Sequence, residues 1–188
     1  PVHATLWRGS AASAVDLHPL NALRSYAYAT DGVLQGGSVQ YQAGDPRRAT
    51  LWYGSASDIV TLGPSNAASE VFGMAPGVQA GYVDVGGAYH ACLWRGTSQS
   101  FVDFNGPESG SRFLGTTGRI HVGDGAGPGV GVEHALVNLG RPDAWLDLHQ
   151  FLPTVFSSFS RAYAVYQDGP TIFVVGEALN PQTNYEAI

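Results

Sequence analysis

The chain has 188 residues, of which 44% are hydrophobic and 13% charged, so it can bury a core as one folded domain. Its net charge is −6 and all nine basic residues are arginine, which excludes the basic surface that binds nucleic acid or anionic membranes. The absence of lysine also excludes Schiff-base catalysis and a phosphate-binding P-loop.

The first elements along the chain are short strands. Residues 2–7 and 14–17 are strand-like runs rich in apolar side chains. Residues 25–32 alternate small and large side chains and end in an Asp-Gly pair, which is typical of a tight hairpin because glycine adopts positive φ without strain. A return strand follows over residues 33–37. We therefore expect antiparallel strands joined by short turns.

The same order of elements recurs along the rest of the chain. Each repeat has a His-Ala-x-Leu-Trp run or a variant of it, at residues 3–7, 48–52, 90–94 and 134–138, and successive copies start 45, 42 and 44 residues apart. A Val-Asp-Leu run or a variant follows, at residues 15–17, 60–62, 102–104 and 146–148. Return strands are expected at residues 33–37, 78–81, 119–123 and 170–176. Each repeat thus carries four short strands. The sequence contains no run of about 18 apolar residues, the length that would predict a membrane span.

Repeats of this length and strand content are typical of propeller blades. We predict an all-β fold: a small β-propeller with four blades of four antiparallel strands, forming a single domain over residues 1–188 from four repeats of about 44 residues. Residues 1–19 would form a half blade that residues 158–188 complete, closing the ring. Residues 184–188 resemble a further third strand, which leaves five blades or a fragment of a larger ring as the alternative.

The His-Ala-x-Leu-Trp-x-Gly motif, the Val-Asp-Leu run and the glycine-flanked return strand resemble the extracellular HAF repeat family of bacteria. The resemblance covers nearly the whole chain and is best from His90 to Asp103. Arg48 replaces the motif histidine in the second copy, and Asn138 replaces the tryptophan in the fourth. The resemblance implies a propeller-like architecture and an extracellular or periplasmic location. It implies no catalytic residues, because the family's members are described as repeats without an assigned function.

Two sets of histidines follow the repeat. His3, His90 and His134 occupy equivalent positions, for which we expect structural roles. His18 and its equivalent His149 each come two residues after an aspartate and so lie on the same strand face as that aspartate. Because a carboxylate can orient an imidazole and raise its basicity, Asp16 and His18 are candidate catalytic residues. The alternative is a hydrogen-bonded corner of a blade.

His121 differs from the other histidines because no other repeat has a histidine at its position. It precedes an acidic, glycine-rich segment over residues 123–129, which we expect to be a loop, and it is a second candidate for a catalytic base. Asp124 in this segment, with Asp45 and Asp84 in equivalent loops, would emerge at one end of the ring. Several carboxylates there could hold Ca²⁺ if their loops bend inward, and no other cofactor is suggested by the sequence. The alternative is a solvated acidic rim.

Four residues follow a repeated serine at the start of each inner strand, and these four are Tyr26, Glu70, Arg112 and Arg161. Inner strands of a propeller border its channel, so these side chains could gather near one opening and grip a carboxylate or a polar head group. They are our candidate ligand-binding residues. The alternative is an ion-pair network that seals a narrow channel.

The leading functional hypothesis is a non-enzymatic binding or interaction module, with a small polar ligand, a glycan or a protein as its partner. The alternative is a small Ca-dependent hydrolase of lactones or esters, with its site at one propeller mouth and His121 or His18 as base. A purely structural array segment is a third hypothesis. No Gly-x-Ser-x-Gly elbow or paired-cysteine metal motif supports an enzyme, and the single cysteine, Cys92, forms no disulfide within the chain.

Overall fold

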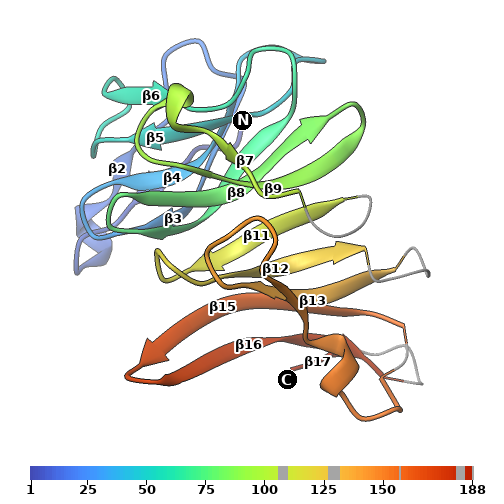
Figure 1. Ribbon diagram of the computed structural model, residues 1–188. Helices are drawn as coiled ribbons and strands as arrows, with labels where there is room; N and C mark the ends of the chain where they lie inside the picture. Colours follow the sequence, from blue (N-terminus) through green and yellow to red (C-terminus); the bar gives the residue numbers. More distant parts are fainter. Residues whose placement is uncertain (106–109, 127–131, 157, 181–184, 188) are drawn as a thin grey trace.

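The computed structural model of the chain is built from β-strands, as the sequence predicted (Figure 1). It describes residues 1–105, 110–126, 132–156, 158–180 and 185–187. The helical segments in these ranges are three short 3-10 turns, Ala11–Ser13 (η1), Ser98–Ser100 (η2) and His149–Phe151 (η3). Within the same ranges, no helix is long and apolar enough to cross a membrane.

Three four-stranded antiparallel sheets form the centre of the molecule, and in each one the strands are hydrogen-bonded in chain order. Sheet I contains β3 (Arg24–Thr30), β4 (Gln35–Gln40), β5 (Arg48–Trp52) and β6 (Ile59–Thr61). Sheet II contains β7 (Ser69–Ala75), β8 (Val78–Val85), β9 (Ala88–Trp94) and β10 (Val102–Asp103). Sheet III contains β11 (Ser111–Thr116), β12 (His121–Ala126), β13 (Glu133–Asn138) and β14 (Trp145–Asp147).

Two smaller sheets lie at the ends of the chain. The N-terminal pair consists of β1 (Thr5–Leu6) and β2 (Val15–Asp16), and the C-terminal sheet of β15 (Ser160–Asp168), β16 (Thr171–Leu179) and β17 (Tyr185–Ala187). The single sheet that we expected from residues 1–19 and 158–188 is not formed by the described residues. Instead β17 pairs with β16 and takes the third-strand position, because residues 185–187 follow the same pattern as the other third strands.

The sheets pack face against face in chain order, from sheet I near the top of Figure 1 to the C-terminal sheet at the bottom. The first strand of each sheet carries much of this packing: β7 contacts β3, β4 and β5, β11 contacts β7, β8 and β9, and β15 contacts β11, β12 and β13. Four apolar clusters fill the four spaces between successive sheets. The core is therefore divided into layers rather than gathered in one centre.

A bulge in every first strand explains the glycine that the return strands repeat. The register between first and second strands shifts by one residue between Val71 and Gly73 in sheet II, and at the same place in the other three sheets. The second-strand residue at this point is always glycine, because a Cβ there would lie only 1.8–2.0 Å from a carbonyl oxygen of the first strand. These glycines are Gly37, Gly81, Gly123 and Gly176.

Candidate functional site

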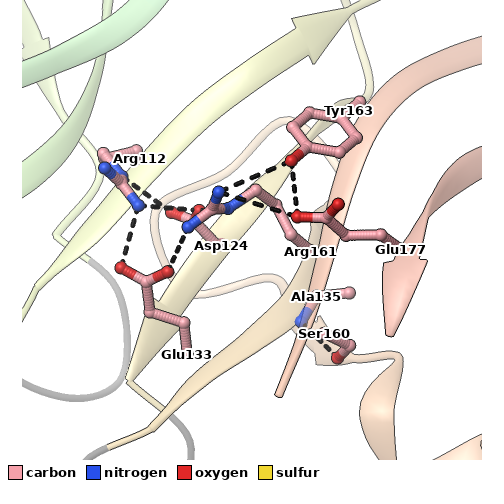
Figure 2. A network of polar contacts seen from close by, with 8 residues as sticks. All are labelled: Arg112, Asp124, Glu133, Ala135, Ser160, Arg161, Tyr163 and Glu177. Atoms are coloured by element: carbon pink, nitrogen blue, oxygen red, sulfur yellow. Dashed lines mark hydrogen bonds and ion pairs between the residues drawn. The ribbon is translucent and has the colours of Figure 1, made fainter. Parts of the chain in front are cut away.

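A serine near the start of each first strand ties its sheet to the preceding sheet. In sheet II, the Oγ of Ser69 accepts a hydrogen bond from the backbone N–H of Ala49 in sheet I, at 3.0 Å. The same bond recurs at Ala4–Ser25 (2.9 Å), Ala91–Ser111 (3.1 Å) and Ala135–Ser160 (2.9 Å), the last of which is drawn in Figure 2. The repeated serine and the alanine of the His-Ala motif therefore hold neighbouring sheets together.

The histidines of the His-Ala motif bond to the aspartates of the Val-Asp-Leu runs. Nδ1 of the histidine lies 2.8–2.9 Å from an aspartate Oδ2 in the pairs His3–Asp16, His90–Asp103 and His134–Asp147. Each pair links the two repeated runs of one repeat. These contacts are of the structural kind that we expected for this set of histidines.

The candidate catalytic pair Asp16 and His18 does not make the carboxylate–imidazole contact that we expected. The Asp16 carboxylate accepts hydrogen bonds from the backbone N–H of His18 and pairs with the His3 ring, and these two contacts, in that order, lower the pKa of Asp16. The His18 ring stacks on the His3 ring at 3.8 Å, with Nε2 3.0 Å from the Ala22 carbonyl oxygen and Nδ1 2.8 Å from the Oγ of Ser25, which is fully buried. His18 thus lies in a hydrogen-bonded corner, the alternative that the sequence left open.

Glu70, a candidate ligand-binding residue, lies in a buried polar cluster between sheets I and II. Its carboxylate accepts hydrogen bonds from the Tyr82 hydroxyl (2.9 Å) and the Ser38 hydroxyl (2.8 Å), and it pairs with Arg47 at 3.0 Å. Burial, and then the negative charge of Glu70, raise the pKa of Tyr82. Tyr26 borders this cluster, with its ring 5.5 Å from the Arg47 guanidinium carbon.

Arg112 and Arg161, the other two candidates, meet around the buried carboxylate of Asp124 (Figure 2). Arg112 binds Asp124 through two hydrogen bonds of 2.9 Å, and Arg161 donates to the same carboxylate from the C-terminal sheet. Both arginines also pair with Glu133. Burial lowers the pKa of Arg161, but its hydrogen-bonded and anionic partners outweigh this effect and raise it. The four candidates therefore lie in two clusters whose charges are paired internally, as in the ion-pair network that the sequence left as the alternative.

The three candidate metal-binding aspartates do not come together. Asp124 is on β12 rather than in a loop, because residues 123–126 continue that strand, and its carboxylate is paired with two arginines. Asp84 is on β8 and accepts a hydrogen bond from the backbone N–H of Gly87, and Asp45 is exposed in the turn before β5. The rest of the expected loop, residues 127–129, lies outside the described residues. In the part of the chain that the structure describes, no three His, Cys, Asp or Glu side chains form a group that could hold a metal ion.

His121 stands where the repeat pattern is broken. In sheets I and II, a glutamine on the second strand pairs directly with the motif tryptophan on the third, as Gln35–Trp52 and Gln79–Trp94. The glutamine Oε1 accepts a hydrogen bond from the backbone N–H two residues after the tryptophan, at 3.1 Å and 2.7 Å. In sheet III the same cross-strand pair is His121–Asn138. Both members of the pair have therefore changed.

Asn138 and Trp145 together make the hydrogen bonds that Gln35 and Trp52 make in sheet I; in sheet II the Nε1 of Trp94 has no partner among the described residues. The Oδ1 of Asn138 accepts hydrogen bonds from the backbone N–H groups of Gly140 and Arg141, so the turn no longer needs a second-strand glutamine. Trp145, the fourth-strand neighbour of Asn138, donates from Nε1 to the carbonyl oxygen of Phe104 at 3.3 Å. Trp52 makes the equivalent bond to the carbonyl oxygen of Leu17, at 2.7 Å. The tryptophan has in effect moved one strand outward.

This rearrangement leaves a pocket of about 770 Å³ between sheets II and III. One wall is the apolar surface of Leu93, Val102 and Phe104 in sheet II. The equivalent surface of sheet I, formed by Leu51, Val60 and Leu62, packs in one cluster with Trp94. In sheet III the residue in the place of Trp94 is Asn138, whose side chain is turned to its own backbone. Val102 therefore stays 42% exposed, whereas Leu93 and Phe104 are buried in one cluster with Phe113. The lining also includes His121 and the arginines Arg95, Arg119 and Arg141.

The His121 side chain is held by one hydrogen bond and two aromatic rings. It is 1% exposed, and its Nδ1 lies 2.8 Å from the Oγ1 of Thr116. The rings of Phe113 and Phe104 lie 5.0 Å and 5.7 Å from the imidazole. Burial, and then the positive charge of Arg95, lower the pKa of His121 to about 4, so the ring is neutral at pH 7. Its Nε2 has no hydrogen-bond partner among the residues that the structure describes.

Comparison with known proteins adds no relative to these observations. A scan of the chain against protein-family models finds no match, and a search of curated proteins finds no similar sequence. The resemblance to HAF repeats therefore stays a prediction, and the functional argument depends on the residues themselves.

Sequence reasoning singled out His121 but missed the residues that surround it. Arg95, Arg119 and Arg141 lie in turns of three different hairpins, and no local motif marks them. A signal was present, however, in the loss of the tryptophan at Asn138 and its reappearance at Trp145. Because the two residues are cross-strand partners, that exchange points to a local rearrangement of the core at this place.

Proposed function

We propose that this chain is a non-enzymatic binding module, and that it holds a small ligand in the pocket next to His121. The polar residues that recur in every repeat are engaged in contacts between and within sheets. The pocket lies at a pair of positions where sheet III departs from the pattern of sheets I and II. Function in repeat proteins is commonly grafted onto the scaffold at such departures.

The pocket between sheets II and III, whose apolar wall includes the exposed Val102, is the observation that carries this proposal. A volume of about 770 Å³ is within the range of pockets that bind small molecules. An apolar wall with a few convergent polar groups is also the usual make-up of such pockets. His121 in the lining supports ligand binding further, because its ring nitrogen Nε2 has no hydrogen-bond partner among the described residues and can bond to a ligand.

We further propose that the stacked sheets are blades of a propeller-like array and that the protein acts outside the cytoplasm. The five separate sheets among the described residues favour the five-blade or larger-ring alternative over four closed blades. The extracellular or periplasmic location follows only from the resemblance to HAF repeats. Small-angle X-ray scattering of the chain would distinguish a closed ring from an open stack.

A fragment screen with a matched variant tests the binding proposal. The variant His121→Gln/Asn138→Trp/Trp145→Ile places in sheet III the trio that sheet I has as Gln35, Trp52 and Ile59. The new tryptophan should cover the apolar wall and fill the pocket. Crystals of the wild-type chain soaked with neutral, anionic and cationic fragments should show occupancy in the pocket, and the variant should lose it.

Two outcomes would contradict the proposal. One is a wild-type pocket that stays empty with fragments of every charge. The other is fragments that bind equally well to a folded variant whose pocket is filled. Because the soaked crystals locate each fragment directly, the first outcome can be read even where the triple variant fails to fold.

A further inference from the structure

We infer that the ligand of the His121 pocket is a small organic acid, a carboxylate attached to an apolar ring or chain. This inference depends on the proposed function, since it names the chemistry of the ligand that the pocket would hold. It is carried by the charges that line the pocket, by the hydrogen-bonding state of those charges and by the apolar wall opposite them.

The pocket lining is cationic in a chain that is acidic overall. Three of the nine arginines, Arg95, Arg119 and Arg141, line it, whereas the described lining contains no aspartate or glutamate. The chain as a whole has 15 acidic residues and a net charge of −6. Guanidinium groups suit planar anions because they donate two parallel hydrogen bonds to a carboxylate. The pocket therefore selects negative charge against the background of the molecule.

The pocket arginines also differ in their partners from the three arginines of the buried polar clusters. Arg47, Arg112 and Arg161 are each paired with a carboxylate side chain that is at most 3% exposed. Arg95 and Arg119, by contrast, form no ion pair with any residue that the structure describes. Arg141 lies 3.6 Å from Asp143, and both side chains are largely exposed, so this contact holds the guanidinium only weakly. The charge of these arginines is thus available to a ligand.

His121, which is part of the pocket lining, supplies a hydrogen-bond donor. The Oγ1 of Thr116 already accepts a hydrogen bond from the backbone N–H of Gly118 at 2.8 Å, which leaves its own hydrogen for Nδ1 of the ring. In that arrangement a neutral imidazole carries its proton on Nε2, the nitrogen without a described partner. An N–H donor complements an anion and repels a cation.

The apolar wall of Leu93, Val102 and Phe104 indicates that the rest of the ligand, apart from its carboxylate, is apolar. In the preceding layer of the molecule the counterpart of this wall is covered by the indole ring of Trp94. A ligand whose ring or chain covers Val102, the exposed residue of this wall, would take the place of the missing indole ring, and a polar sugar would not. The pocket therefore fits an acid with an apolar body better than a uronic acid or a free phosphate.

Titration calorimetry with the whole chain tests this inference with five probes. Phenylacetate is the expected ligand, phenylacetamide and benzylamine keep its ring with a neutral and a positive group, glucuronate keeps the carboxylate on a polar body, and inorganic phosphate is a bare anion. We expect phenylacetate to bind at least about tenfold more tightly than each of the other four, the difference that one charged contact supplies. Arg119→Gln should weaken its binding by about tenfold. Arg24→Gln, which removes the same charge from sheet I, should leave it unchanged.

The outcomes separate this inference from the proposed function. If phenylacetamide or benzylamine binds the pocket as tightly as phenylacetate, the anion preference is wrong while the binding module stands. If glucuronate or phosphate binds as tightly, the apolar body is wrong. If Arg24→Gln weakens phenylacetate as much as Arg119→Gln does, the effect is one of overall charge and the inference fails. If no probe binds and the fragment screen finds the pocket empty, both proposals fail.

Discussion

Sheets II and III have the same arrangement of four strands and the same serine links to the preceding sheet. They differ in how they fill the space between themselves and that preceding sheet. Sheet II closes that space with Trp94, and the glutamine beside it, Gln79, holds the following turn. Sheet III puts Asn138 and His121 at these positions and leaves a pocket. The comparison shows that a repeat scaffold can open a pocket by a change of two cross-strand partners, without a change in its backbone pattern.

The contrast also separates two kinds of polar residue. The serines, the histidine–aspartate pairs and the Asp124 cluster have partners inside the molecule. Their hydrogen bonds and ion pairs hold the strands and sheets together. The polar groups of the pocket have few partners of their own. Four predictions, from the largest expected effect to the smallest, test this difference between the two sheets.

The largest difference should appear when the residue at the tryptophan position is truncated. Trp94→Ala should lower the free energy of unfolding by about 3–5 kcal/mol, because it opens a cavity in a fully buried cluster. Asn138→Ala should cost about 1–3 kcal/mol, since it removes only the acceptor for two backbone N–H groups. Urea unfolding measures both values. Equal losses would mean that the two positions are packed alike.

The pH dependence of stability should reveal the buried histidine of sheet III. The pKa of His121 is depressed from 6.5 to about 4. The stabilisation that depends on a neutral His121 ring is therefore fully present above pH 6.5 and is lost as the pH falls toward 4. Over that window the wild type should lose up to about 3 kcal/mol relative to His121→Gln, which has the residue of sheet II. Urea unfolding at several pH values gives the two curves, and parallel curves would contradict the prediction.

The serine links should count equally on both sides of sheet II. Ser69→Ala and Ser111→Ala each remove the acceptor of a buried alanine N–H, so each should lower the free energy of unfolding by about 1–3 kcal/mol. Thermal and urea unfolding of the two variants provide the test. A negligible loss at either serine would show that its link does not hold the sheets together.

The smallest effects should be those of the pocket arginines. Arg95→Gln and Arg119→Gln should each change the free energy of unfolding by less than about 0.5 kcal/mol, because both side chains are exposed and have no carboxylate partner among the described residues. Arg24→Gln, an exposed arginine on β3, is the matched control. A loss above 1 kcal/mol, beyond that of the control, would assign these arginines to the scaffold.

Part of this picture could be read from the sequence. The alternation of small and large residues, the Asp-Gly turns and the spacing of the repeats predicted an all-β chain with four-stranded antiparallel units, and the structure confirms this. The strand at residues 185–187 was also foreseen as an alternative. These features are local, because strand pairing between neighbours in the chain depends on short-range patterns and turn residues.

The candidate site was predicted less well. The expected grouping of Tyr26, Glu70, Arg112 and Arg161 at one opening divides into two clusters, and the carboxylates of Asp45, Asp84 and Asp124 lie apart. Equivalent positions in a repeat share a backbone environment. The partners of their charged side chains, however, depend on which residues the neighbouring sheet has at that place. Asp16, by contrast, bonds within its own repeat, to the ring of His3 rather than to the ring of His18.

The sequence by itself determined the strands, their order and the glycines that every bulge requires, because these depend on residues near one another in the chain. Only the tertiary structure decided where polar groups find partners and where the core stays open. The pocket is formed by residues from β9 to β13, the turns beside them and Gln167 of β15. Val102 stays exposed in it because Asn138 is too short and too polar to replace an indole ring. Such a pocket exists only where sheets pack together, and no single sheet forms it alone.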